Sequence, residues 1–281
     1  MLRTAILTAC AAIAMMAQTT VIQPSAPNPV TETRTFALKS GGRLKIDNTN
    51  GGIKISAWDK DEVALTANFT PSSRNKAHSK IKVKSNINSL ELIIEHPREW
   101  NEVGSCQLEL KVPGSVASNI QTVNGSITIN GITGKNNTET TNGNIVMENV
   151  GGNVKAETTN GGIVMKNVSG NIKAETTNGG IVMENVSGNI NAETTNGSVT
   201  GSIQNIEDVV DISTTHGNIR FKLLNPKGSF TASTDYGNIR IPPGAENVNV
   251  DKDGNSSTVR AKYDGKAKIR FITGYGSITV Q

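Results

Sequence analysis

One phrase of the sequence is written three times with almost no change. It reads TTNGNIVMENVGGN at 140–153, TTNGGIVMKNVSGN at 158–171 and TTNGGIVMENVSGN at 176–189. The residue before the first glycine of this phrase recurs every 18 residues, then every 20, and lastly after 39. A fixed period of this length is typical of a solenoid, in which each repeat forms one coil that stacks on the next. The positions are Asn124, Asn142, Asn160, Asn178, Asn196, His216, Tyr236 and Tyr275.

Each period holds two short strands bounded by Gly and Asn. Lys166 must face water, so alternation along its strand places Ile163 inward and Val164 outward. The same argument, applied to both strands, gives the interior of one coil. The expected inward residues are Ile163, Met165, Val168, Ile172, Ala174 and Thr176. Because one coil cannot bury these side chains alone, the sequence predicts parallel stacking of like coils about 4.8 Å apart.

Stacking also brings equivalent polar residues together. The asparagine before each glycine is expected to occupy a corner that needs a left-handed residue, and stacked asparagines can hydrogen-bond along the axis. Glutamates at 139, 157, 175 and 193 form a column of like charge, which Lys155 and Lys173 on the same face are expected to offset.

The rest of the chain keeps this alternation less regularly. We predict an N-terminal β section at 34–120, a regular β-solenoid at 121–245, and C-terminal coils with a cap at 246–281. Aromatic residues make up 4% of the chain and it contains 28 glycines, a composition that favours strands and turns over helices. The predicted fold is all-β: a parallel β-solenoid, or β-helix, with coils of 18 to 20 residues.

The first residues have the form of an export signal. A positive charge at Arg3 precedes a short apolar run, and residues 1–17 are interpreted as a signal peptide cleaved after Ala17. Lipidation of Cys10 is the alternative, because LTAC at 7–10 resembles a lipoprotein cleavage box. Residues 18–33 are rich in Pro, Thr and Ser and are predicted to be a flexible tether. The expected location is the periplasm, the outer-membrane surface or the extracellular space, and no transmembrane segment is expected.

Catalytic and metal-binding patterns are missing from the sequence. No pair among His78, His96 and His216 has metal-ligand spacing, and the carboxylates are scattered, so we predict no catalytic residue, metal or cofactor. Cys106 is the only cysteine besides Cys10 and is expected to be a buried apolar residue.

Aromatic rings occupy three late corner positions, His216, Tyr236 and Tyr275. Rings at equivalent positions of stacked coils are expected to stack along an exposed edge. A strip of aromatic residues that binds sugar is the functional alternative, because ring faces suit that role.

Three basic residues fall at outward sites of the late coils, Arg220, Lys222 and Arg240. An acidic surface polysaccharide could dock there by charge attraction, and a solvated face that discourages edge pairing is the plain alternative. The formal net charge of only +4 does not favour nucleic acid as a partner.

The order of several weak motifs resembles a family of exported bacterial proteins known as putative adhesins. The motifs lie at 44–51, 53–55, 58–63, 112–114 and 123–127, followed by the repeated Asn-Gly coils, so that the resemblance covers about 36–281. It implies a β-solenoid whose biochemical activity is largely unknown, with no catalytic residues to assign.

Taken together, the residues and the resemblance favour an exported, non-enzymatic β-solenoid that is an adhesin-like binding or structural protein of the surface or envelope. Its expected partner is an envelope polysaccharide or another surface macromolecule. A carbohydrate-active β-helix enzyme, either a polysaccharide lyase or a hydrolase, is the alternative. A scaffold that self-associates is a third interpretation.

Overall fold

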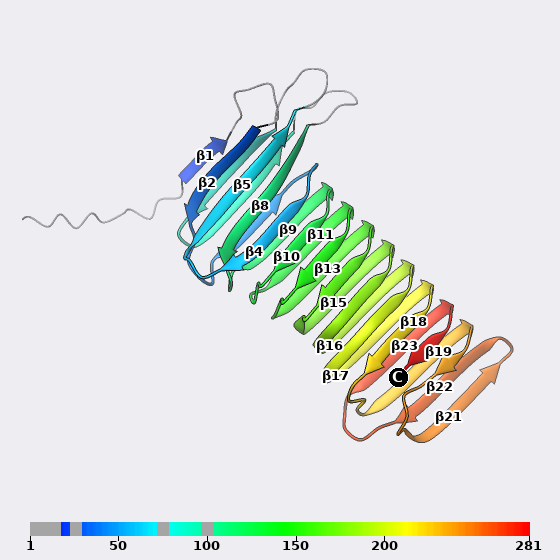
Figure 1. The fold of residues 1–281 in the computed structure, drawn as a ribbon. Helices are drawn as coiled ribbons and strands as arrows, with labels where there is room; N and C mark the ends of the chain where they lie inside the picture. Colours follow the sequence, from blue (N-terminus) through cyan, green and yellow to red (C-terminus); the bar gives the residue numbers. More distant parts are fainter. Residues whose placement is uncertain (1–17, 23–29, 72–78, 97–103) are drawn as a thin grey trace, which may run out of the picture.

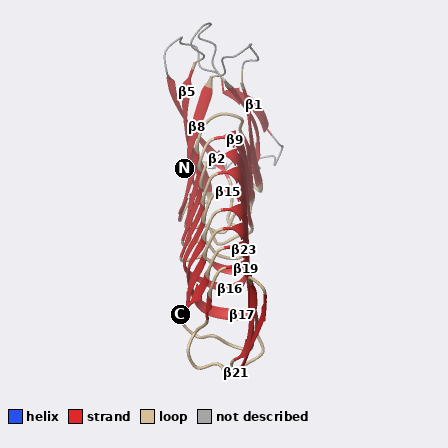
Figure 2. Cartoon of the chain, turned by 90° about the vertical axis from the view of Figure 1, so that its right-hand side faces the viewer, coloured by secondary structure: helices blue, strands red, loops and turns tan. Residues whose placement is uncertain are grey.

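A computed structural model describes residues 18–22, 30–71, 79–96 and 104–281, and these form a twisted rod of stacked β-strands (Figure 1). No helix occurs in these ranges, which confirms the all-β prediction. The predicted signal peptide, Cys10 and His78 lie outside the described residues. In a view turned by 90° about the vertical axis, the strands form two facing layers that enclose the core (Figure 2).

The first layer contains the longer strands. In spatial order it consists of β1 (Gln18–Ile22), β6 (Lys80–Asn86), β7 (Ser89–Glu95), β3 (Arg43–Asp47), β9 (Ala117–Asn124), β11 (Asn136–Asn142), β13 (Asn153–Asn160), β15 (Ser169–Asn178), the later parts of β16 (Ile181–Asn196) and β17 (Val199–His216), β23 (Lys268–Tyr275), β19 (Ser229–Tyr236), β22 (Ser256–Lys262) and β21 (Glu246–Asp253).

The second layer faces the first and contains shorter strands over most of its length. In spatial order it consists of β2 (Val30–Ala37), β5 (Glu62–Thr70), β8 (Ser105–Pro113), β4 (Ile53–Trp58), β10 (Ile127–Asn130), β12 (Ile145–Glu148), β14 (Ile163–Lys166), the early parts of β16 and β17, β18 (Ile219–Leu223), β24 (Ile278–Val280) and β20 (Ile239–Arg240).

Neighbouring central coils pair in parallel with equivalent residues side by side. Ile145 pairs with Ile163, and Ile163 pairs with Ile181. All six residues that the sequence placed inside the coil are buried, and Ile163 and Met165 are 0% exposed. Burial of a side chain of this size contributes about 1.5–3 kcal/mol. The core is therefore a set of columns of like side chains that run along the rod.

The sheet is mixed, because its two ends are antiparallel. At the N-terminal end β1 pairs antiparallel with β6, and β2 with β5; at the C-terminal end β22 pairs antiparallel with both β19 and β21. The ladders between the central coils are parallel, whereas the two end sections, which the sequence predicted to be less regular, contain the antiparallel pairs. The tether predicted at 18–33 also needs correction, because β1 and the start of β2 lie within it. These strands contain Thr, Val and Ile, which favour β structure, and they find partners in β6 and β5 despite the Pro-rich composition of the segment.

The spatial order of coils departs from the sequence order near each end. The coil formed by β3 and β4 has β7 and β8 on one side and β9 and β10 on the other. Likewise, β23 and β24 lie between the β17–β18 strands and the β19–β20 strands. The last coil of the chain thus separates two coils that are consecutive in sequence.

A buried threonine joins each coil to the preceding one. Thr176 Oγ1 donates a hydrogen bond of 2.8 Å to the carbonyl oxygen of Gly161. Gly161 itself allows close approach of the coils, since a methyl group there would collide with the carbonyl of Gly143. The equivalent bonds, which follow the spatial order of the coils, are Thr122–Gly51, Thr140–Gly125, Thr158–Gly143, Thr194–Gly179, Thr214–Gly197, Thr273–Gly217 and Thr234–Gly276.

These bonds give a test with a matched control inside the core. We expect Thr176→Val to destabilise the fold by about 1 kcal/mol, because it leaves the half-buried Gly161 carbonyl without its side-chain donor. Thr138→Val should be neutral or stabilising, since the buried Thr138 hydroxyl has no hydrogen-bond partner among the described residues. Denaturant unfolding of both variants measures the difference, and equal losses would contradict this role of the Thr–Gly bonds.

Candidate functional site

A ladder of asparagine side chains runs along one edge of the rod. Asn142 Nδ2 donates to Asn124 Oδ1 at 2.8 Å, and Asn160 donates to Asn142 at 2.9 Å. The ladder starts at Asn50 and continues through Asn178 to Asn196. This confirms that the asparagines before each glycine bond along the axis.

The left-handed backbone positions are not those expected from the sequence. The Asn-Gly corners were expected to need a left-handed residue at the asparagine. Positive φ occurs instead at the asparagines that follow the short second-layer strands, Asn149 (54°), Asn167 (53°) and Asn185 (57°). The chain turns back toward the first layer after these residues, and Asn tolerates that conformation better than most side chains.

Three aromatic rings continue this edge where the asparagines end. His216 and Tyr275 stack with ring centroids 5.0 Å apart and an interplanar angle of 2°, and Tyr275 and Tyr236 stack at 5.0 Å and 3°. The stacking expected at these positions is confirmed, although Tyr275 lies between the other two rings. Both faces of the Tyr275 ring are covered by its neighbours, so the ladder presents mainly ring edges to solvent. A sugar that stacks on a ring face could use the outer face of Tyr236 but not that of Tyr275.

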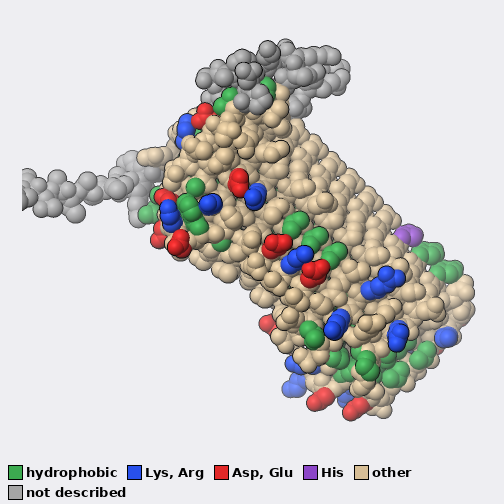
Figure 3. Space-filling view, viewed as in Figure 1, with side chains coloured by type: hydrophobic (Ala, Val, Ile, Leu, Met, Phe, Trp, Pro, Cys, Tyr) green, Lys and Arg blue, Asp and Glu red, His purple; other side chains and the backbone are tan. Residues whose placement is uncertain are grey.

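The basic residues predicted to bind an anion lie on the second layer. Arg220, Lys222 and Arg240 are exposed and belong to β18 and β20. Strand β24 lies between those two strands and places Thr279 between Arg220 and Arg240. Figure 3 shows basic side chains on this end of the rod as separate spots rather than one continuous patch. Arg220 and Arg240 therefore lie two strands apart, and Lys222 lies two residues from Arg220 on the same strand.

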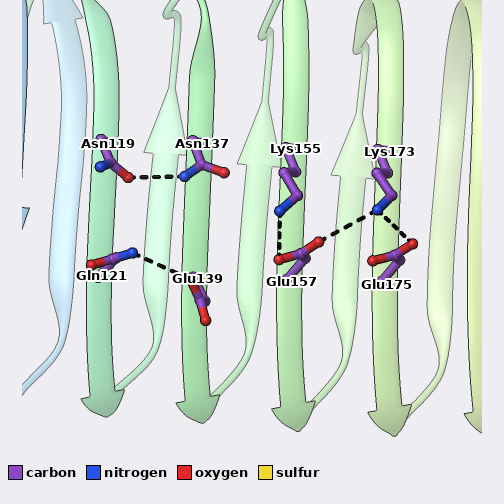
Figure 4. A network of polar contacts seen from close by, with 8 residues as sticks. All are labelled: Asn119, Gln121, Asn137, Glu139, Lys155, Glu157, Lys173 and Glu175. Carbon is purple, nitrogen blue, oxygen red and sulfur yellow. Dashed lines mark hydrogen bonds and ion pairs between the residues drawn. The ribbon is translucent and has the colours of Figure 1, made fainter.

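The outer surface of the first layer carries continuous polar rows (Figure 4). Lys155 Nζ lies 2.7 Å from a carboxylate oxygen of Glu157. Lys173 Nζ bridges two coils, with 3.6 Å to Glu157 and 2.8 Å to Glu175. These contacts confirm that the lysines offset the column of like-charged glutamates.

The ion pairs fix the charge states of this network. Partial burial of Glu157 acts to raise its pKa, but hydrogen bonds from Lys155 and with Glu175, and the charges of Lys155 and Lys173, hold the pKa below its ordinary value. The hydrogen bond to Glu175 raises the pKa of Lys173. Glu157 and Lys173 are therefore both ionised at neutral pH.

Two open grooves run side by side across the first layer. One has a volume of about 420 Å³ and is lined by glutamates and threonines of successive coils, among them Glu139, Glu157, Glu175 and Glu193. The other has a volume of about 640 Å³ and crosses the beginnings of β3, β9, β11, β13 and β15. Its cations are Arg43, Lys45, Lys135 and Lys155, and none of the described residues that line it is Asp or Glu. We call it the cationic groove.

Sequence reasoning missed the cationic groove, because its cations come from distant segments. Arg43 pairs with Ala117 and Lys45 with Asn119, and the ladder then continues into the regular repeat. Aligning RLKI at 43–46 with the start of each repeat coil would have placed Arg43 and Lys135 in one row. The alternation of residues indicated which side chains face outward, but it did not indicate the order in which the coils stack.

A second polar cluster lies at the N-terminal end of the core. Ser79 Oγ lies 2.6 Å from His96 Nδ1, and Asn48 Oδ1 lies 2.9 Å from His96 Nε2. The arrangement resembles a nucleophile and its base, yet the Ser79 side chain is 0% exposed. Asn48 also donates to the carbonyl of Cys106, as the threonines do in later coils, so the cluster has a structural role. Cys106 is buried as predicted, and burial raises the pKa of its thiol to about 12.

These features define a class of protein: a two-layered β-solenoid rod with antiparallel ends and open polar grooves. The chain belongs to the Toastrack family, DUF4097, whose model matches residues 41–281. This family membership agrees with the resemblance to putative adhesins. No helix in the described part of the chain has the length and apolar character needed to cross a membrane.

The chain is also similar, at low sequence identity, to several solved structures. A putative adhesin from Bacteroides fragilis NCTC 9343 is 13% identical, with 92% of this chain and 100% of that chain covered and a TM-score of 0.48. A putative cell adhesion protein from Clostridium sporogenes ATCC 15579 is also 13% identical, with 90% and 99% covered and a TM-score of 0.23. A putative lipid binding protein from Parabacteroides distasonis ATCC 8503 is 10% identical, with 89% and 96% covered and a TM-score of 0.24. No curated protein matches the sequence.

The role of Lys173 can be tested by its pH dependence. We expect Lys173→Gln to destabilise the protein by about 0.5 kcal/mol at neutral pH and low salt, because two glutamates lose a shared cation. Glu157 has a lowered pKa in the folded state, so its stabilising contribution is present above the unfolded value of about 4.3 and is lost as the pH falls through the folded value. The difference from the unmodified protein should therefore shrink in acid.

Lys166→Gln provides the control, because Lys166 has the same side-chain exposure of 45% but pairs with Glu184 alone. Thermal melts of both variants between neutral pH and pH values below the glutamate range make the comparison. A Lys173→Gln deficit that stayed constant with pH would contradict the electrostatic account.

Proposed function

We propose that this protein is an exported, non-enzymatic, adhesin-like binding protein that presents a rigid, repetitive surface at the cell envelope. The observation that carries the proposal is the register of the central coils, which places equivalent outward residues side by side along the first layer. A surface of this kind repeats the same contact at intervals of about 4.8 Å. It suits an extended partner that is itself repetitive, such as an envelope polysaccharide or another surface macromolecule.

Hydrogen bonds between outward side chains support a surface fixed before binding. The asparagine ladder holds each amide against its neighbours, and the Lys173 bridge ties two coils together. Side chains that are already ordered lose less conformational entropy when a partner binds. Both grooves are open along the surface, so a long chain can lie across several coils without its end having to enter a closed pocket.

The second layer supplies a further contact surface in this proposal. We retain Arg220, Lys222 and Arg240 as exposed charges that can attract an anionic partner over a broad area. The edges of the His216, Tyr275 and Tyr236 rings lie at the border between the two layers and would contribute shape rather than ring-face stacking.

A carbohydrate-active enzyme is the alternative that one observation favours. Successive glutamates of the acidic groove, such as Glu157 and Glu175, lie on neighbouring strands about 4.8 Å apart, close to the carboxylate separation of retaining glycosidases. Such an enzyme needs one carboxylic acid with a raised pKa to protonate the leaving group. The pKa of Glu157 is lowered by the lysines instead, and this favours binding over catalysis.

The proposal is tested by incubating the purified protein with envelope fractions of the source organism and with a panel of envelope glycans. We expect cosedimentation or capture by at least one fraction and no release of reducing or unsaturated sugar ends. Glycan cleavage that disappears in a Glu157→Gln/Glu175→Gln variant would replace the proposal with the enzymatic alternative. Failure to bind any fraction would overturn it.

A further inference from the structure

We propose that the cationic groove of the first layer is a binding site for a linear acidic polysaccharide with carboxylate-bearing sugars. This inference rests on the proposed function and assigns it a site and a ligand chemistry. Two rows of outward side chains form the groove. The first row is Arg43, Ala117, Lys135, Asn153 and Asn171, and the second is Lys45, Asn119, Asn137 and Lys155.

The charges in the groove favour an anionic ligand. Lys45 and Lys155 are each paired with a glutamate, Glu91 and Glu157, at 2.7 Å. Within the described chain, neither Arg43 nor Lys135 forms an ion pair, and both are exposed. These two cations stand in the same row, two strands apart, so their spacing is about 10 Å. They can contact carboxylates on non-adjacent units of one chain.

The amides between the cations favour a hydroxylated ligand. Asn137 Nδ2 donates to Asn119 Oδ1 at 2.9 Å, and Asn171 donates to Asn153 at 2.9 Å. An Asn amide group has two N–H donors, and each ladder bond uses one of them. The other N–H remains to donate to a sugar hydroxyl at every coil.

The length and period of the groove match an extended sugar chain. It crosses the five strands from β3 to β15, or four spacings of about 4.8 Å each, about 19 Å in all. A pyranose unit in an extended chain has a length close to one such spacing. Successive sugar units would therefore lie over successive coils, with the cations Arg43 and Lys135 facing non-adjacent units.

The acidic row beside the groove limits the width of the ligand. Glu139, Glu157 and Glu175 lie two residues farther along the same strands as the second row, a distance of about 7 Å. A narrow single chain in the groove avoids these carboxylates, whereas a nucleic acid duplex would extend over them and be repelled. Among the described residues that line the groove, none is an aromatic residue on which a nucleic acid base could stack.

The experiment measures binding of the purified full chain to linear oligogalacturonate long enough to span the groove, by isothermal titration calorimetry at low salt. Fully methyl-esterified oligogalacturonate of the same length is the neutral control, because it keeps the sugar chain and removes the charge. The test variant is Arg43→Ser/Lys135→Ser. The matched control is Arg260→Ser/Lys262→Ser, which removes one exposed arginine and one exposed lysine from β22, at the C-terminal end of the first layer.

We expect the acidic oligomer to bind, the methyl ester to bind at least about tenfold more weakly, and the test variant to lose about tenfold or more in affinity. The matched control should keep its affinity within about twofold, and both variants should keep the melting temperature because the replaced side chains are exposed. Equal losses in both variants, a loss in the control alone, or equal binding of the methyl ester would overturn the proposal.

Two further outcomes separate this inference from the proposed function. Failure to bind oligogalacturonate while envelope fractions are still captured would overturn the groove assignment alone. Failure of both would overturn the proposed function as well. Duplex DNA that competed for the groove with equal affinity would replace the polysaccharide with nucleic acid as its ligand.

Discussion

The fold depends on burial of apolar side chains between coils. Within one coil, Ile163 and Met165 have only a thin interior to face, and they become fully buried because the same residues stack above and below them. Parallel ladder hydrogen bonds set the spacing, and the buried threonine of each coil adds a bond to the coil before it. The stability of such a rod is close to a sum of interface terms between neighbours. Because the central repeats are nearly identical, the interfaces between them are formed by the same residue types.

The same register determines the outer surface. A side chain that points outward on one coil is followed by its equivalent on the next, so polar residues form rows rather than isolated sites. The rows differ in character: asparagines bond to each other along the edge, glutamates are held by lysines, and cations and amides line a groove. Two antiparallel ends cover the stack, which leaves the regular surface between them available for a partner. Binding to an extended polymer follows more naturally from this arrangement than chemistry at one point.

The central coils were predictable from the sequence because one exact period fixes both the register and the facing of their residues. Lys166 must face water, and from that single constraint the burial of Ile163 and the outward position of Val164 follow. The ends were less predictable, since the pairing of β1 with β6 or of β23 with β17 depends on contacts between distant segments. The sequence contains no signal that Tyr275 enters between His216 and Tyr236.

The candidate site was only partly predictable for a related reason. Stacking of the three corner rings followed from their equivalent positions, but the cationic groove needs the coil that contains Arg43 to lie beside the coil that begins at 117. Strands β5 to β8 lie between these two coils in the sequence, so the composition does not predict that the coils are neighbours. The left-handed asparagines were assigned to the wrong corner because both corners of the coil contain Asn near Gly.

The most direct measurement of the central claim is removal of one whole coil. Deletion of residues 161–178 joins Asn160 to Gly179 and restores the same Asn-Gly corner with every remaining row in register. The account predicts a folded, cooperatively melting protein whose maximum dimension in small-angle X-ray scattering is shorter by about 5 Å. An unfolded product, or a folded one of unchanged length, would contradict it.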